Sequence, residues 1–151
     1  MTKIKFKNPA TTVDIIVVKL NKILLVKRKY GPFKDMWALP GGFINYGKEN
    51  LEQAAARELL EETGLKAIDL KLIGVYSESH RDPRGHVISH AYYATTHGEA
   101  KANDDAKELK YFSLYRLPKL AFDHKKIIKD YEKWENQQFA ISEFYRLWDG
   151  R

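Results

Sequence analysis

The stretch of sequence that decides the fold runs from Arg57 to Leu65 and reads RELLEETGL. It ends a segment in which apolar residues recur at helical spacing, so we predict a helix over Leu51–Thr63. Asn50 is a suitable N-cap because its side chain can accept from the first free backbone N–H groups. Gly64 is a suitable C′ residue because glycine tolerates the left-handed backbone there.

Three glutamates crowd the last turns of this helix: Glu58, Glu61 and Glu62. Residues three and four apart share a helix face, and like charges at that spacing cost a few tenths of a kcal/mol each. Magnesium offsets this repulsion, since it prefers oxygen ligands and takes a few carboxylates. Glu58 and Glu62 are best placed to hold one ion, with Glu61 reaching it from the flank or holding a second. The alternative is an acidic, solvated helix face.

Residues before the helix complete the candidate metal site. Glu49 and Arg57 are eight positions apart and can form an ion pair that braces the loop against the helix. Gly41 and Gly42 let the backbone turn tightly and offer a carbonyl oxygen toward the metal. We therefore count Gly41 with the three glutamates as a metal-ligand candidate.

This pattern resembles the Nudix box: Gly, five residues, Glu, seven residues, then Arg-Glu-apolar-any-Glu-Glu-any-Gly-apolar. The matching residues are Gly42, Glu49, Arg57, Glu58, Leu59, Glu61, Glu62, Gly64 and Leu65. The chain departs from the pattern in one respect, because six residues separate Gly42 from Glu49 and Lys48 stands where the family often has Glu. We interpret this as a loop insertion, which costs little free energy.

The resemblance implies an α/β (α+β) Nudix fold, an αβα sandwich with a mixed β-sheet and the Nudix loop-helix-loop. It also implies hydrolysis of a pyrophosphate bond by metal-activated water, with Mg²⁺ as the cofactor and Mn²⁺ as the alternative. Catalytic roles then fall to Glu49, Arg57, Glu58, Glu61 and Glu62. A carboxylate must take the proton of the water. The candidates for this base are Glu61 in the helix and Asp104, Asp105 and Glu108 ahead of the last strand; the alternative for each is a solvated position.

Segments outside the box resemble the ADP-ribose pyrophosphatases of archaeal and bacterial type, from about Asn8 to Tyr131. These segments are Lys27–Lys29, Pro32–Phe33, Trp37–Phe43, Arg81–His86, Asp104–Ala106 and Ala121–His124. The resemblance implies that ADP-ribose and water become AMP and ribose 5-phosphate.

Basic and aromatic residues near these segments are candidates for substrate binding. Arg28, Arg81, Arg84 and His86 can reach phosphate or ribose oxygens, and Phe33, Trp37 and Tyr46 can stack on adenine. The alternatives are a solvated hairpin loop for the basic residues and core packing for the aromatic ones, above all Trp37. His124 is expected to pack at a helix N-terminus rather than to bind a ligand.

The remaining elements follow from periodicity. Val13–Val18 and Ile23–Val26 predict a hairpin with a short Asn-containing turn, and 30–46 predicts a long loop. Further expected elements are strands at Leu70–Tyr76, Val87–Ala94 and Leu109–Leu114, a helix from about Asp123, and a second short helix through Phe139–Trp148.

Length and composition set wider limits. The 151 residues fit a single domain, 1–151, and the absence of cysteine excludes disulfides and thiol chemistry and is in keeping with the cytoplasm. No stretch approaches the roughly 20 apolar residues of a membrane span. The net charge of +6 comes from short clusters that favour a solvated surface over nucleic-acid binding. Lys3–Phe6 alternates like an edge strand, which suggests a homodimer.

Three other functions share the box. A nucleoside triphosphate pyrophosphatase of the 8-oxo-dGTP type differs only in its base pocket. A non-catalytic ADP-ribose sensor would carry a winged helix behind the Nudix domain, and we expect too few residues here for one. An RNA-cap hydrolase, suggested by the net charge, would bind long RNA with steep salt dependence. We prefer turnover of a small nucleotide.

Overall fold

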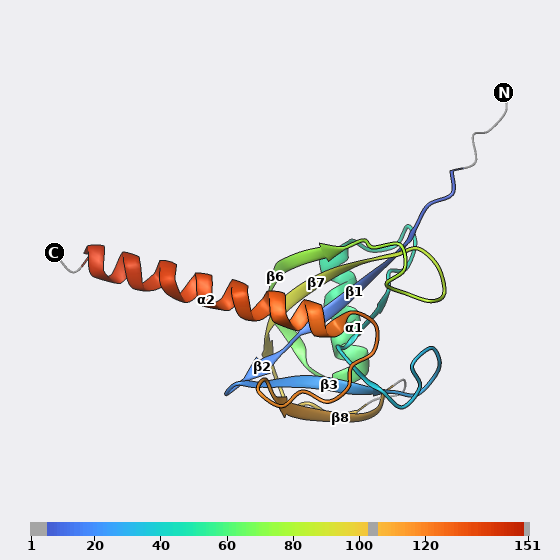
Figure 1. Ribbon diagram of the computed structural model, residues 1–151, viewed down its shortest axis with the longest axis horizontal. Coiled ribbons are helices and arrows are strands. Elements are labelled where there is room, and N and C mark those ends of the chain that lie inside the picture. Colours follow the sequence, from blue (N-terminus) through green and yellow to red (C-terminus); the bar gives the residue numbers. More distant parts are fainter. Residues whose placement is uncertain (1–5, 103–105, 150–151) are drawn as a thin grey trace.

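The computed structural model describes residues 6–102 and 106–149. In chain order the elements are β1 (Ala10–Ile16), β2 (Val18–Lys19), β3 (Lys22–Arg28), β4 (Trp37–Ala38), β5 (Gly41–Phe43), α1 (Leu51–Thr63), β6 (Lys66–Tyr76), β7 (Val87–His97), β8 (Ala106–Ser113) and α2 (His124–Asp149). Figure 1 shows the sheets with α1 and α2 on either side. The expected αβα arrangement with a mixed sheet is confirmed.

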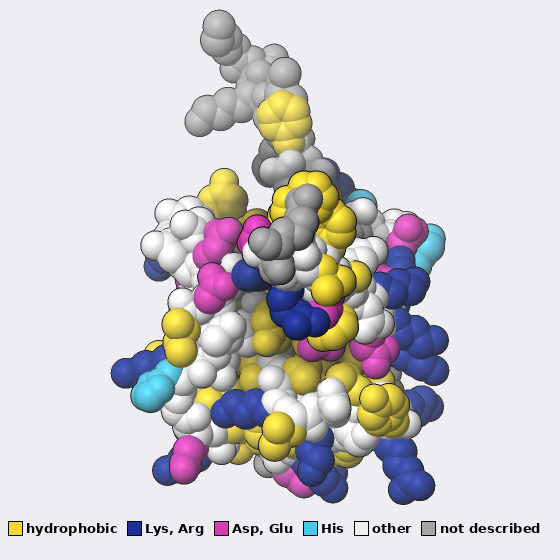
Figure 2. Space-filling model, turned by 90° about the vertical axis from the view of Figure 1, so that its left-hand side faces the viewer, with side chains coloured by type: hydrophobic (Ala, Val, Ile, Leu, Met, Phe, Trp, Pro, Cys, Tyr) yellow, Lys and Arg dark blue, Asp and Glu magenta, His cyan; other side chains and the backbone are white. Residues whose placement is uncertain are grey.

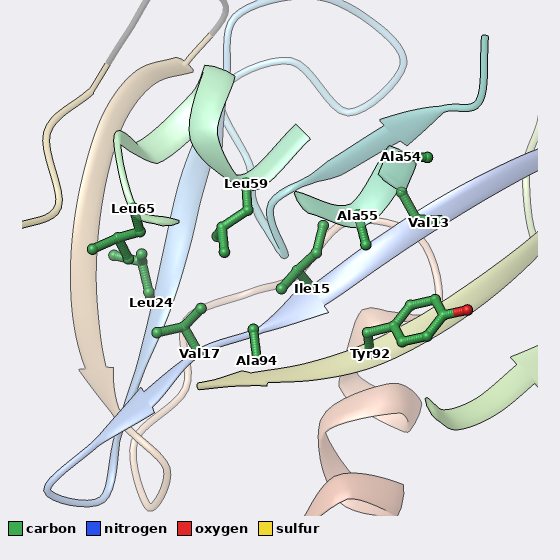
Figure 3. Packing of buried hydrophobic residues seen from close by; sticks show 10 residues of the cluster. All are labelled: Val13, Ile15, Val17, Leu24, Ala54, Ala55, Leu59, Leu65, Tyr92 and Ala94. Atoms are coloured by element: carbon green, nitrogen blue, oxygen red, sulfur yellow. The ribbon is translucent and has the colours of Figure 1, made fainter. Parts of the chain in front are cut away.

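One sheet has the order β5-β1-β7-β6, and its pairing is mixed because β1 and β7 run parallel while β5 and β6 pair antiparallel. Alternate residues of β1 face opposite layers. Val13 and Ile15 pack with α1, whereas Ile16 packs with the buried start of α2. Figure 3 shows the first of these clusters, in which side chains of β1 and β7 meet those of α1.

A second sheet consists of β2, β3 and β4, with β8 on the other edge of β3. The expected hairpin is therefore only partly right. The run over Val13–Val18 divides at Val17, so that β1 joins the first sheet and only β2 pairs with β3. The turn is as short as predicted: Leu20 and Asn21 both have positive φ, 50° and 59°, which is the backbone of a tight two-residue hairpin loop.

The expected loop over 30–46 is also corrected, because it contains β4 and β5. Both strands are too short to show a period of two, and β5 begins with two glycines, which disfavour strands on propensity. Pairing to β1 and β3 forms them instead. The other predicted strands are present within longer or shifted spans, and Lys3–Phe6 lies outside the described residues except for the exposed Phe6.

Helix α1 begins and ends as predicted. The Asn50 side chain accepts from the Gln53 N–H at 2.8 Å, and the Gln53 side chain accepts from the Asn50 N–H at 2.9 Å. This reciprocal pair satisfies two backbone donors at the helix start. Gly64 has φ 73° and closes the helix by donating its N–H to Leu60 O at 2.9 Å.

Helix α2 replaces the two C-terminal helices that we expected. Between Asp123 and Phe139 there is no glycine or proline to interrupt the helix, so it continues to Asp149. Its first turns bury Ile127, Ile128 and Tyr131, and its second half extends beyond the sheets (Figure 1). Within the described part of the chain, no helix combines the length and apolar character needed to cross a membrane.

Candidate active site

Arg57 organises the acidic end of α1. Its guanidinium binds Glu49 through two hydrogen bonds, Nε to Oε2 at 2.8 Å and Nη2 to Oε1 at 2.6 Å. Nη2 also donates to Phe43 O at 3.1 Å. Glu49 in turn accepts from the Asn45 N–H at 2.8 Å. The anticipated ion pair is thus present, and it fixes the inserted loop against the helix.

Two further carboxylates share the same guanidinium. Arg57 Nη1 donates to Glu58 Oε1 at 2.7 Å and to Glu61 Oε2 at 3.1 Å. The hydrogen bonds from Arg57 and from the Asn45 N–H lower the pKa of Glu49 to about 2. Burial raises the pKa of Glu58, although Arg57 opposes this. A cation beside Glu58 would favour its charged form.

The third carboxylate binds a strand. Glu62 Oε2 accepts from the Gly41 N–H at 2.9 Å, so β5 lies directly against α1. A Cβ at position 42 would stand 2.6 Å from Glu58 Oε1, and one at position 41 would stand 2.1 Å from Val13 O. The two glycines therefore allow close approach. They lie in an extended strand, which corrects the tight turn that we expected.

The donor set fits a hard divalent cation. Glu58, Glu61 and Glu62 offer only carboxylate oxygens, the ligands that Mg²⁺ and Mn²⁺ accept. Among the described residues, no three carboxylate or imidazole groups already converge on one point. The reason is visible in the contacts, since Arg57 holds Glu58 and Glu61 while Glu62 binds Gly41. A bound ion would compete with Arg57 for the first two.

A small pocket of about 150 Å³ adjoins Glu62 and Gly41. Arg28 lies on its wall, and its guanidinium is close enough to Glu62 for their charges to interact. A larger cavity of about 630 Å³ lies between the segment after β8 and α2, and none of the three box glutamates lines it. We therefore place the candidate active site at the smaller pocket, next to the carboxylates.

Three of the substrate-binding candidates meet around Phe122. Arg28 stacks over the Phe122 ring at 4.8 Å, Phe33 meets it edge-on at 4.8 Å, and Arg84 lies 5.6 Å from it. Arg84 also lies over the Phe43 ring at 4.9 Å and forms an ion pair with Asp82 at 2.7 Å. The structure thus brings two guanidinium groups and aromatic rings together beside the Arg28 pocket.

The other candidates lie apart from this cluster. Trp37 packs edge-on against Phe112 at 4.7 Å in the core between β3 and α2, in line with the alternative stated for it. Tyr46 is 93% exposed. His86 Nε2 lies 3.0 Å from Ser77 O, at the end of the loop that leads into β7.

Arg81 is buried rather than open to a substrate. Its side chain is 4% exposed and binds Asp123 through two hydrogen bonds, at 2.9 and 2.6 Å. Neither the expectation that it reaches a phosphate or ribose oxygen nor the alternative of a solvated loop position matches this contact. Because Asp123 precedes α2, the pair fastens the loop between β6 and β7 to the helix start.

Sequence reasoning missed the polar network behind β5. Asp14 is buried and accepts a hydrogen bond from the Ser89 hydroxyl, while His124 Nε2 lies 3.4 Å and Arg81 Nη2 3.9 Å from its carboxylate. His124 Nδ1 accepts from the Leu39 N–H at 3.0 Å, as befits the packing residue that we expected. The signal was available, since Asp14 interrupts the apolar run of β1.

Burial alone would raise the pKa of Asp14, but His124, Ser89 and Arg81 together hold it below its ordinary value. Each of these neighbours thus opposes the effect of burial on the carboxylate. Of the remaining candidate bases, only Glu108 lies within the described residues. Glu108 pairs with Lys27 at 3.7 Å across β3 and β8, and Asp104 and Asp105 lie outside the described residues.

Comparison with known proteins agrees with this geometry. The family model described as the NUDIX domain matches residues 8–131. An ADP-ribose pyrophosphatase of Methanocaldococcus jannaschii is 57% identical over 132 residues, which are 87% of this chain and 78% of that protein.

Two solved structures are similar throughout. A MutT/nudix family protein from Enterococcus faecalis superimposes with a TM-score of 0.81 at 32% identity, over 90% of this chain and 66% of that one. The NUDIX domain of Shewanella oneidensis NrtR complexed with ADP ribose gives a TM-score of 0.76 at 30% identity, over 85% of this chain and 89% of that domain. The family model matches most of this chain, and Glu58 and Glu62 of the box lie against Gly42 and Gly41. The chain belongs to the Nudix family.

Proposed function

We propose that this protein hydrolyses the pyrophosphate bond of ADP-ribose to give AMP and ribose 5-phosphate. The observation that supports this most directly is the set of three carboxylates at the end of α1, with Glu58 and Glu61 bound to Arg57 and Glu62 bound to Gly41 of β5. The 57% identical relative is named an ADP-ribose pyrophosphatase, and the similar NrtR domain was solved with ADP ribose. Both favour ADP-ribose over a nucleoside triphosphate.

Members of the family depend on a divalent metal, and we propose Mg²⁺ as the cofactor, with Mn²⁺ as a substitute. Glu58, Glu61 and Glu62 would hold it, with the carbonyl oxygen of Gly41 as a further ligand. When bound, the cation neutralises charge on the pyrophosphate oxygens and activates water. Arg57 and Glu49 would orient these ligands, because Arg57 touches Glu58 and Glu61 and is itself fixed by Glu49.

Glu61 is our choice for the base that takes the proton of the attacking water. Its side chain is 55% exposed, so water reaches it, whereas Glu58 is largely buried. Glu108 is less suited because it already forms an ion pair at 3.7 Å with Lys27, a residue that lines the same pocket as Glu62. Asp105 is the alternative base. To separate the two, turnover is compared between Glu61→Gln and Asp105→Asn. The variant that loses more turnover while its metal affinity is unchanged identifies the base.

The cluster around Phe122 would bind the substrate. Arg28 lies on the pocket beside Glu62, so its guanidinium is suited to a phosphate oxygen next to the cleaved bond. Phe33 and Phe122 offer ring faces and edges for adenine. Arg84 would bind from the Phe43 side. Residues 1–151 would form one Nudix domain, and its lack of cysteine is in keeping with our proposal that it works in the cytoplasm.

The test is a panel of ADP-ribose, other nucleotide sugars, NADH, 8-oxo-dGTP and capped RNA, assayed with Mg²⁺ and compared by kcat/KM. We expect ADP-ribose to be preferred and AMP to be the product. The Glu62→Gln variant should lose most turnover while keeping its melting temperature. A preference for a triphosphate would refute the substrate, and a fully active Glu62→Gln variant would refute the metal assignment.

A further inference from the structure

The second half of α2 carries large apolar side chains on its surface. Between 50% and 60% of each of four residues is exposed: Ile141, Phe144, Tyr145 and Trp148. They lie three, four and seven positions apart, so they share one face of the helix. Figure 2, which looks onto the end of α2, shows hydrophobic side chains gathered around that end.

This face continues the one that packs on the sheet. Ile127, Trp134, Ile141 and Trp148 follow one another at intervals of seven residues, with Tyr131 and Tyr145 between them. A seven-residue repeat of this kind is the pattern of a helix that pairs with another helix. The first part of the seam, through Trp134, is covered by the protein's own core. The part from Ile141 onward is exposed.

We propose that a second copy of this chain covers the exposed part, with the two α2 helices packed antiparallel about a two-fold axis. The axis would pass between Phe144 and Tyr145. Ile141 of one copy then lies opposite the partner's Trp148, and Phe144 lies opposite the partner's Tyr145. A two-fold interface must be complementary to itself, and this face meets that condition.

The charges flanking the face are complementary as well. The same axis sets Glu143 beside the partner's Arg146. Within one chain these two residues already form an ion pair at 2.8 Å. Because the Arg146 side chain is 70% exposed and that of Glu143 is 38% exposed, each can pair with the partner's residue instead. Antiparallel packing also sends the two sheet bodies to opposite ends of the helix pair, whereas parallel packing would bring them together.

The area involved sets the strength of the contact. A large aromatic side chain presents roughly 150–250 Å², so Phe144, Tyr145 and Trp148, each little more than half exposed, together with Ile141 offer roughly 400 Å² per copy. Two copies bury roughly 800 Å², before the stems of the flanking polar residues are added. A specific interface needs about 1,000 Å². We therefore expect a dimer that dissociates on dilution, through the micromolar range.

Sedimentation equilibrium of the full chain over a wide concentration range tests this. The mass should rise from 17.6 kDa toward twice that value. Ile141→Glu should shift dissociation to at least tenfold higher concentration. The control is Phe139→Glu, which places the same charged residue on the opposite face of the helix, where Phe139 is 69% exposed, and it should leave the dissociation unchanged. A monomer at every concentration, or equal effects of the two variants, would overturn the proposal.

Cross-linking tests the orientation, since the native chain has no cysteine. Under mild oxidation Tyr145→Cys, next to the proposed axis, should form a disulfide-linked dimer. Ile141→Cys should not form one, because the residue that lies opposite it in the antiparallel pair is the partner's Trp148. The reverse result would show parallel packing and refute the antiparallel pair. Since none of these residues lies at the carboxylate site, either result leaves the proposed hydrolysis untouched.

Discussion

Substitutions at the adjacent residues Gly41 and Gly42 should have different effects, one on stability and the other on activity. A Cβ at position 42 would meet three atoms of the Glu58 carboxylate at 2.6–2.8 Å, whereas ordinary contact begins at 3.4 Å. The carboxylate must therefore retreat by about 1 Å. Because it is the far end of a flexible side chain, we expect Gly42→Ala to fold normally. A displacement of that size in a catalytic group costs roughly 100-fold in rate.

Gly41→Ala provides the contrast. Its Cβ would stand 2.1 Å from Val13 O, a backbone atom of β1. The strands must separate, and overpacking of this kind costs roughly 2 kcal/mol of the free energy of unfolding. For a chain of this size the melting temperature should fall by roughly 4–8 °C. Gly42→Ala should leave it nearly unchanged.

The assay is the initial rate of ADP-ribose hydrolysis, first at the Mg²⁺ concentration that saturates the native protein and then at higher concentrations, with melting curves of the same preparations. Gly42→Ala should be folded and slow, and raised Mg²⁺ should recover part of the rate if Glu58 is a ligand. A Gly42→Ala variant with the wild-type rate would refute the close contact of Glu58 with β5. A variant that loses stability as Gly41→Ala does would show that β5 itself moves.

Three further predictions concern the residues behind the carboxylates. Arg57→Lys keeps the charge but loses the paired hydrogen bonds to Glu49, so turnover or metal affinity should fall roughly 10- to 100-fold, measured as rate against Mg²⁺ concentration; an unchanged curve would contradict this. His124→Ala leaves the buried Leu39 N–H without its acceptor and should cost about 1–3 kcal/mol in urea unfolding, whereas His124→Asn, which restores an acceptor near Nδ1, should cost less. Glu49 has a pKa lowered from 4.5 to about 2, so its contribution to stability is complete above pH 4.5 and is lost as the pH falls toward about 2; urea unfolding of Glu49→Gln across that range should decline less steeply than wild type, and parallel curves would count against the pair.

The sequence alone predicted the structure correctly where the structure depends on residues close together in the chain. The cap at Asn50, the end at Gly64 and the shared face of the glutamates all follow from spacings of three or four residues, and all are observed. The Glu49–Arg57 pair joins residues eight positions apart on a loop and the helix it enters. Local rules therefore predicted α1 and the loop that precedes it.

The sequence was insufficient where distant segments decide the outcome. Strand β5 exists because Gly41 and Gly42 pair with β1, and a three-residue strand shows no period of its own. Arg81 looked available for phosphate because its partner, Asp123, lies 42 positions away. For the same reason the meeting of Phe33 with Phe122 was not foreseen, since no spacing rule joins them.

The buried Asp14 explains why the segment before β5 is so closely fixed. Placing a carboxylate in the core is costly unless other groups pair with it, and here Ser89, His124 and Arg81 surround it. Two of these partners also attach α2 to the sheet. His124 is the first residue of the helix, and Arg81 binds Asp123 just before it.

The same network ends at the strand that holds the proposed metal ligands. His124 accepts from the Leu39 N–H, Ile15 donates its N–H to Pro40 O at 2.8 Å, and Gly41 donates to Glu62. Three consecutive residues are thus fixed in turn by α2, β1 and α1. A ligand carboxylate is held within a fraction of an ångström only if its own supports are rigid. We therefore interpret the buried Asp14 as part of the link by which α2, on one side of the sheet, fixes the position of Glu62 on the other side.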